Sequence, residues 1–272
     1  MDVSIFNMPF FYNSLIVILL SSILSGLIGT YIVTRRLVFL SGGISHASFG
    51  GIGIGYFLGI NPLIGAAGFS LLTAFAIHYG NKLLKLRFDS VIGILWSLGM
   101  ALGVVFIYLT PGYVPDLMSY LFGSILLVSK TDILLLGILT LITIIVFSVF
   151  YYQILFISFD AEYAHTKGVN TNIFDLGLLI LVSLVIVANI RVAGIVLVIA
   201  LLTIPANIAN IFTNDYKKIM VLAMLFSLIG SLAGLLISFT FNIPSGASIV
   251  LMLATMFLLC KLCVYVFKKK KR

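Results

Sequence analysis

Long apolar runs alternate with short polar segments along the whole chain. Each run has about 17–25 residues, the length an α-helix needs to cross a bilayer, and lacks the alternation typical of a membrane barrel strand. We therefore predict an all-α, polytopic transmembrane helical bundle that forms a single domain over residues 1–272. About nine spans (eight to ten) are expected, near 13–34, 38–60, 62–80, 90–110, 132–152, 173–190, 192–212, 219–241 and 246–266.

Basic residues cluster between these runs and set the expected orientation. Short Lys- and Arg-rich loops mark the cytoplasmic side of membrane proteins. Placing every cluster there predicts nine crossings, an outside N-terminus and a cytoplasmic C-terminus; the clusters are Arg35 and Arg36, Lys82 to Arg87, Lys217 and Lys218, and Lys268 to Arg272. The piece 117–129 is short for a span, so we expect a partial or re-entrant helix buried against protein.

Composition supports this class. Hydrophobic residues make up 62% of the chain and charged residues 9%, with a mean hydropathy of +1.26, far from soluble domains. The net charge of +8 reflects the loop clusters and a tail suited to anionic lipid headgroups, so no nucleic-acid partner is expected.

The first apolar run lacks a basic n-region and a cleavage site, which indicates a retained helix. Cys260 and Cys263 supply half a structural zinc site at most; two small apolar residues are the simpler interpretation.

All eight acidic residues fall in loops or at span ends. Because no carboxylate lies at mid-membrane, the pattern argues against an ion-coupled secondary transporter and against an intramembrane hydrolase. The segment "GSILLVSKT" (123–131) lacks the glycine that a phosphate-binding loop needs before Lys130. We expect no enzyme activity in this chain. If transport is powered by a nucleotide, another chain hydrolyses it.

The segment "SGGISHASFG" (41–50) places an ionisable side chain, His46, inside the second span. Small residues recur at every fourth position beside it (Gly43, Ala47, Gly51, Gly55, Gly59), a pattern that lets membrane helices approach closely. A neutral imidazole is a common transition-metal ligand. The alternative is a structural histidine that donates to a carbonyl on the next helix.

A second polar face lies in "LLTIPANIAN" (201–210), where Thr203, Asn207 and Asn210 share one side of the helix. Pro205 frees the carbonyl of Leu201. This face either lines a path or makes hydrogen bonds between helices.

The loop "FDAEYAHTKGVN" (159–170) is polar and suits a short helix that ends at Gly168. A small amphipathic helix between spans is suited to bind a soluble partner and to pass its movement to the spans.

Four segments together resemble one family: "RRLVFLSGGISHASFGGIGIGYFLGINP" (35–62), "FDAEYAHTKGV" (159–169), "RVAGIVLVIALLTIPANIA" (191–209) and "IPSGASIVLMLA" (243–254). They are similar, in the same order, to zinc/manganese/iron-type permeases of bacterial ABC metal importers. The resemblance implies a single permease domain related to the vitamin B12 importer fold, working as a homodimer in the bacterial inner membrane. It also implies a cytosolic ATPase dimer, an extracytoplasmic metal-binding protein, and transported Zn, Mn or Fe without a permanently bound cofactor. In this resemblance 159–169 is the coupling helix that docks on the ATPase, through Asp160, Glu162, Ala164 and Gly168.

One position departs from the family. Its members carry an aspartate one turn before the histidine, and here that residue is Gly42. We therefore expect His46 to be the metal ligand without its carboxylate partner, and a path lined by Ser45, His46, Thr203 and Asn207. The alternatives are an importer of a chelated metal or another small solute, or a passive channel or secondary transporter that acts without an ATPase.

Overall fold

The apolar runs form helices throughout the part of the chain that the computed structural model describes, residues 9–84, 87–112, 118–123 and 125–270. No strand occurs among these residues, which confirms the all-α prediction. The elements are α1 (Pro9–Leu24), η2 (Ser25–Gly29), α2 (Thr30–Thr34), α3 (Val38–Phe57), α4 (Pro62–Leu84), α5 (Phe88–Leu109), α6 (Met118–Phe122), η3 (Ile125–Leu127), α7 (Lys130–Val149), α8 (Tyr151–Phe159), α9 (Ala161–Thr166), α10 (Thr171–Phe212), α11 (Tyr216–Phe241) and α12 (Ser245–Lys270).

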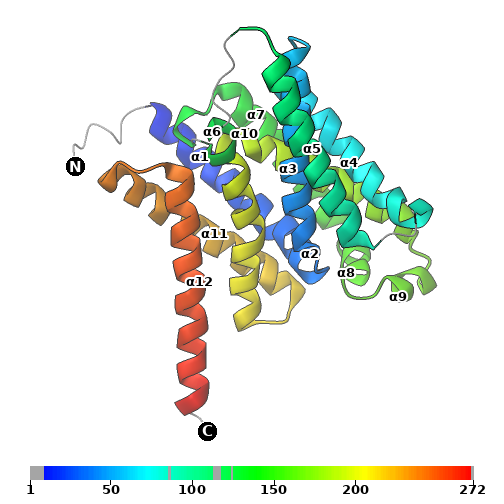
Figure 1. The fold of residues 1–272 in the computed structure, drawn as a ribbon. Coiled ribbons are helices and arrows are strands. Elements are labelled where there is room, and N and C mark those ends of the chain that lie inside the picture. Colours follow the sequence, from blue (N-terminus) through cyan, green and yellow to red (C-terminus); the bar gives the residue numbers. More distant parts are fainter. Residues whose placement is uncertain (1–8, 85–86, 113–117, 124, 271–272) are drawn as a thin grey trace.

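Helix α3 lies at the centre of one half of the bundle, between α4, α5 and α10 (Figure 1). Its glycines bring backbones into direct contact on two sides. A Cβ at Gly50 would lie 2.8 Å from the carbonyl oxygen of Gly99 in α5, and a Cβ at Gly51 would overlap the carbonyl of Gly65 in α4. The close approach expected from the small-residue pattern is therefore confirmed.

Helix α10 contains two helical segments that meet at Gly194, whose φ of 78° and ψ of 161° are not helical. The start of α10 and the start of α11, the helix that follows α10 after a short loop, both border the end of α8. Arg35 binds Asp175 in α10 and Ile157 in α8, and Tyr216, the first residue of α11, lies against Ser158. The chain therefore folds back at Gly194 (Figure 1). Only glycine adopts this backbone without strain.

The proline in the second segment of α10 is accommodated by a hydrogen bond from another helix. Pro205 stays within the helix, and the hydroxyl of Ser25, in the π-helical turn η2, donates to the carbonyl of Leu201. This carbonyl is the one that the proline frees from its intrahelical bond. A buried serine thus satisfies the acceptor inside the bundle.

Seven helices within the described residues are long and apolar enough to cross a membrane. The number differs from the nine predicted spans for two reasons. The two predicted spans 173–190 and 192–212 both lie in α10, and the glycine- and serine-rich α3 is not among the seven. The count of nine is therefore not confirmed. The described residues of the piece 117–129 include the short α6 and η3, in accord with a partial helix.

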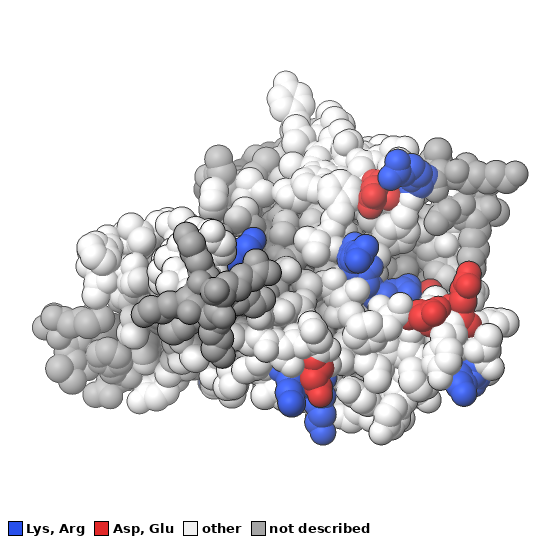
Figure 2. All heavy atoms as spheres, turned by 90° about the horizontal axis from the view of Figure 1, so that it is seen from below, with Lys and Arg blue, Asp and Glu red and all other residues white. Residues whose placement is uncertain are grey.

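Charged side chains mark the face that carries α9, as Figure 2 shows from below. The described acidic residues lie in loops or in the first two turns of helices, as expected: Asp89, Asp132, Asp160, Glu162, Asp175 and Asp215. Asp2, Asp116 and the side chains of the basic tail 268–272 lie outside the described residues.

Candidate translocation and coupling sites

The imidazole of His46 lies flat against the indole of Trp96. The two ring centroids are 4.3 Å apart and the ring planes differ by 7°. Trp96 comes from α5, and the ring of Phe39, at the start of α3, lies 5.7 Å from the indole on a tilt of 36°. The Nδ1 atom of His46 is buried and has no hydrogen-bond partner among the described residues. The carbonyl acceptor required for a purely structural histidine is thus not found at this nitrogen.

The same indole covers Gly42. A Cβ built on Gly42 would lie 3.4 Å from the indole carbon Cζ3 of Trp96 and 3.9 Å from Cδ1 of Ile199 in α10. Helices α3, α5 and α10 therefore converge at this point. The indole thus lies at van der Waals distance from the position, one turn before His46, where the family resemblance leads us to expect a carboxylate.

The other expected path residues donate hydrogen bonds to carbonyl groups of their own helices. Ser45 is fully buried and donates to the carbonyl of Ser41. Thr203 donates to the carbonyl of Ile199, and the amide of Asn207 donates to the carbonyl of Thr203. No hydrogen bond between described residues joins any of them to His46. The hydrogen bonds between helices that were the alternative for the Thr203 face are therefore not seen at these two side chains.

Metal-ligating side chains are sparse in the described part of the chain, where no group of three or more His, Cys, Asp or Glu residues could hold a metal ion. Cys260 and Cys263 are both free thiols. For a metal that passes as cargo, the ligand that this region offers is the imidazole of His46. One imidazole binds a divalent ion weakly unless water or other groups complete its coordination.

The loop expected to contact a soluble partner forms the short helix α9. The carboxylate of Asp160 caps its first turn by accepting from the backbone N–H groups of Glu162 and Tyr163, both at 3.0 Å. Gly168, with a φ of 78°, ends it as expected, and the N–H of Val169 donates to the carbonyl of Ala164. Ala164 is fully buried, whereas Glu162 is exposed, so one side of α9 is anchored and the other is available.

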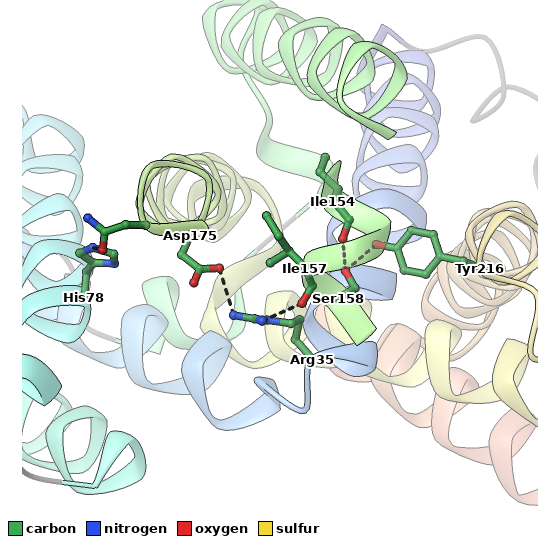
Figure 3. Close-up of polar contacts among 8 residues, drawn as sticks. Arg35, His78, Ile154, Ile157, Ser158, Asp175 and Tyr216 are labelled. Atoms are coloured by element: carbon green, nitrogen blue, oxygen red, sulfur yellow. Dashed lines mark hydrogen bonds and ion pairs between the residues drawn. The ribbon is translucent and has the colours of Figure 1, made fainter. Parts of the chain in front are cut away.

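A polar cluster next to α9 was not found from the sequence (Figure 3). Arg35 donates through Nη1 to the carbonyl of Ile157, at 2.7 Å, and through Nη2 to the carboxylate of Asp175, at 3.0 Å. Nearby, Nε2 of His78 lies 3.0 Å from the side-chain oxygen of Asn172. These side chains line a cavity of about 790 Å³. From the sequence, Arg35 served only to indicate the cytoplasmic side. No pattern in the sequence indicates that Arg35 contacts residues as distant along the chain as Ile157 and Asp175.

A second ion pair lies away from this cluster. Nε of Arg191 is 2.7 Å from the carboxylate of Asp132. Asp132 also closes a capping box with Ser129 at the start of α7. Arg191 precedes the reversal at Gly194 by less than one turn, so the pair ties this reversal to α7.

The comparisons with known proteins agree on one family. The model of the ABC 3 transport family matches residues 7–264. An uncharacterized membrane protein of Synechocystis is 41% identical over 92% of this chain and 89% of its own length. The manganese transport system membrane protein MntC of Listeria monocytogenes is 36% identical over 91% of this chain and 88% of its own.

Among solved structures, PsaBC from Streptococcus pneumoniae in complex with Fab matches with a TM-score of 0.82 and 33% identity. The match covers 93% of this chain and 91% of that chain. Sequence and fold therefore lead to the same family, which the motifs at 35–62 and 159–169 had indicated. The chain belongs to the ABC 3 transport family.

Proposed function

We propose that this protein is the membrane permease subunit of an ATP-binding-cassette importer that moves a divalent transition metal into the cytoplasm. The observation that carries the proposal is the match over residues 7–264, together with a relative 36% identical over 91% of the chain that is named for manganese transport. Manganese is accordingly the first metal to test. Zinc and iron, the other metals expected from the resemblance, are the next.

In this proposal the cargo passes His46, on a path that Ser45, Thr203 and Asn207 also line. The central position of α3 and the buried, unpartnered Nδ1 of His46 support this role. Water molecules would complete the coordination of the metal, because the chain offers one imidazole here. A weakly held ion suits transport, since a tightly bound one would leave slowly.

The energy would come from a cytosolic ATPase dimer that docks on α9 of each subunit in a permease homodimer. The anchoring of α9 by Ala164 and the exposure of Glu162 support a lever of this kind. Asp160 and Gly168 fix its two ends. An extracytoplasmic metal-binding protein would deliver the cargo on the opposite side.

The proposed membrane arrangement has nine crossings in one domain over residues 1–272, in a bacterial inner membrane. It counts α3 and both segments of α10 as crossings, which adds two to the seven apolar helices. The N-terminus would lie outside and the C-terminus in the cytoplasm, so that α9 faces the ATPase. The relation to the vitamin B12 importer fold stays a prediction.

The test is reconstitution of the subunit in liposomes with its ATPase and its binding protein. We expect ATP hydrolysis stimulated by manganese-loaded binding protein, and uptake of manganese that requires all three components. Uptake by this chain alone would instead identify a passive channel or a secondary transporter. Complexes that hydrolyse ATP without a response to manganese, zinc or iron would contradict the proposal.

One observation favours a second cargo, a chelated metal. The indole of Trp96 lies beside both Gly42 and His46, and an aromatic surface suits an organic chelator better than a bare ion. The same liposomes separate the two cargoes, because a chelate importer responds to the chelate and not to the free ion.

A further inference from the structure

The last turn of α8, which leads directly into α9, is held from two sides (Figure 3). The final carbonyl groups of a helix have no intrahelical partner. Arg35 supplies one by donating to the carbonyl of Ile157 at 2.7 Å, and its positive charge also suits a helix C-terminus. On the other side, the hydroxyl groups of Ser158 and Tyr216 lie 3.4 Å apart, which connects the turn to α11.

Only one residue separates this turn from α9. The single residue Asp160 ends α8, through its N–H to the carbonyl of Phe156 at 2.8 Å, and caps α9 with its carboxylate. Ile157 and Ala164, one on each side of Asp160, are fully buried. A displacement of α9 must therefore move the carbonyl of Ile157 with it.

Arg35 carries this displacement to two further segments. It ends the helix α2 and precedes α3, on which His46 lies. Its second guanidinium nitrogen pairs with Asp175 at 3.0 Å, in the first turns of α10. A planar guanidinium can hold a carbonyl and a carboxylate at once in a fixed geometry, which a lysine ammonium does not reproduce. The two side chains are 22% and 27% exposed, so solvent screens the pair only in part.

We propose that Arg35 is the positioning residue that transmits movement of the 159–169 coupling helix to α3 and α10. The proposal rests on the proposed function, since it assumes that an ATPase moves α9. Arg35 touches neither cargo nor nucleotide. It acts through its hydrogen bond to the carbonyl of Ile157 in α8 and its ion pair with the carboxylate of Asp175 in α10. Because Arg35 itself lies at the α2–α3 junction, one residue connects these three parts of the fold.

The test compares Arg35→Gln with a matched control, Arg36→Gln. Arg36 is the adjacent residue, is exposed and makes no ion pair or hydrogen bond to the described side chains, so both variants lose one positive charge from the same loop. Asp175→Asn is the third variant, because it removes the ion pair and leaves the bond to Ile157. Each variant is assembled with its ATPase in nanodiscs, and only monodisperse complexes are compared.

Spin labels report the movement without any cargo. Cys260 and Cys263 are first replaced by serine, and single cysteines are then placed at His165, on α9, and at Val38, on α3; both positions are exposed. Distances between the two protomers are measured without nucleotide and in the ATP-trapped state. In the parent and in Arg36→Gln we expect both label pairs to shift. In Arg35→Gln the α9 pair should shift and the α3 pair should not.

Transport provides the second measurement. Metal moved per ATP hydrolysed should fall by roughly ten-fold in Arg35→Gln, within the range of typical coupling energies, by less in Asp175→Asn, and not in Arg36→Gln. A purely structural role would lower assembly of the complex without separating the two label pairs. An α3 shift of normal size in Arg35→Gln overturns the proposal. Normal label shifts in the parent without metal transport would instead overturn the proposed cargo and leave the role of Arg35 supported.

Discussion

The imidazole of His46 is stacked on the indole of Trp96, with ring centroids 4.3 Å apart and ring planes within 7° of parallel. Stacking uses one face of the imidazole ring and leaves the buried Nδ1 atom at the ring edge without a hydrogen-bond partner among the described residues. Trp96 is the only tryptophan of the chain. Its fluorescence therefore reports directly on the environment of His46.

Replacement of His46 by alanine should remove metal binding at this position. Mn²⁺ is paramagnetic and should quench the emission of Trp96 in the wild-type chain in nanodiscs, whereas His46→Ala should lose this quenching. Manganese uptake by the complete complex should fall by roughly 10- to 100-fold, the scale seen when groups that support a metal site are lost. His165→Ala, which removes an exposed histidine of α9, is the control for the quenching measurement. Unchanged quenching in His46→Ala would place any metal site elsewhere.

Restoring a carboxylate beside His46 should strengthen metal binding only when the indole is removed. In Gly42→Asp the new Cβ would be in van der Waals contact with the indole, 3.4 Å from Cζ3 of Trp96, so the carboxylate beyond it competes with the ring for the space beside His46. In Gly42→Asp/Trp96→Ala the carboxylate and the imidazole share one helix face at i and i+4. The loss of the free Mn²⁺ signal in electron paramagnetic resonance measures the affinity of each protein.

We expect the double variant to bind Mn²⁺ about ten-fold or more tightly than the wild type, with little gain in either single variant. An equal gain in Gly42→Asp alone would mean that Trp96 does not occupy this space. Adding His46→Ala to the double variant should abolish the gain.

Replacement of Gly194 by alanine should disrupt folding. A positive φ costs a residue with a side chain about 1–3 kcal/mol, and the added Cβ would also lie 2.8 Å from the carbonyl oxygen of Leu121. Gly177→Ala is the matched control in the same helix, because a Cβ there meets nothing within 4 Å. Thermal unfolding in detergent, followed by size-exclusion chromatography, should show a large drop in the midpoint for Gly194→Ala and none for Gly177→Ala. Equal midpoints would show that the reversal at Gly194 tolerates a side chain.

Loss of the cap of α9 should weaken the binding of the ATPase. Asp160→Ala removes the acceptor of two N–H groups, which should destabilise this short helix by about 1 kcal/mol. Asp160→Asn keeps an acceptor oxygen and should retain most of the affinity. Titration of the ATPase onto the permease in nanodiscs measures the difference. If Asp160→Asn binds the ATPase as weakly as Asp160→Ala, the ATPase recognises the negative charge of Asp160 and does not depend on the helix cap.

The sequence predicted the features that depend on local patterns. The lengths of the apolar runs predicted the helices, and small residues at every fourth position predicted the close packing of α3. Gly168 predicted where α9 ends. Pro205 indicated that the carbonyl of Leu201 is freed from its intrahelical bond, and the structure shows that the hydroxyl of Ser25 donates to it. These predictions hold because helix propensity, steric size and backbone hydrogen bonding act over a few neighbouring residues.

Only the tertiary structure revealed which distant residues meet. No pattern in the chain placed Trp96 over Gly42 and His46, or joined Arg35 to Ile157 and Asp175. The fold-back of α10 at Gly194 likewise depends on a backbone geometry that a glycine permits but does not require. Such contacts are set by how whole helices pack, and that packing decides whether a lone histidine faces a carbonyl, a carboxylate or an indole.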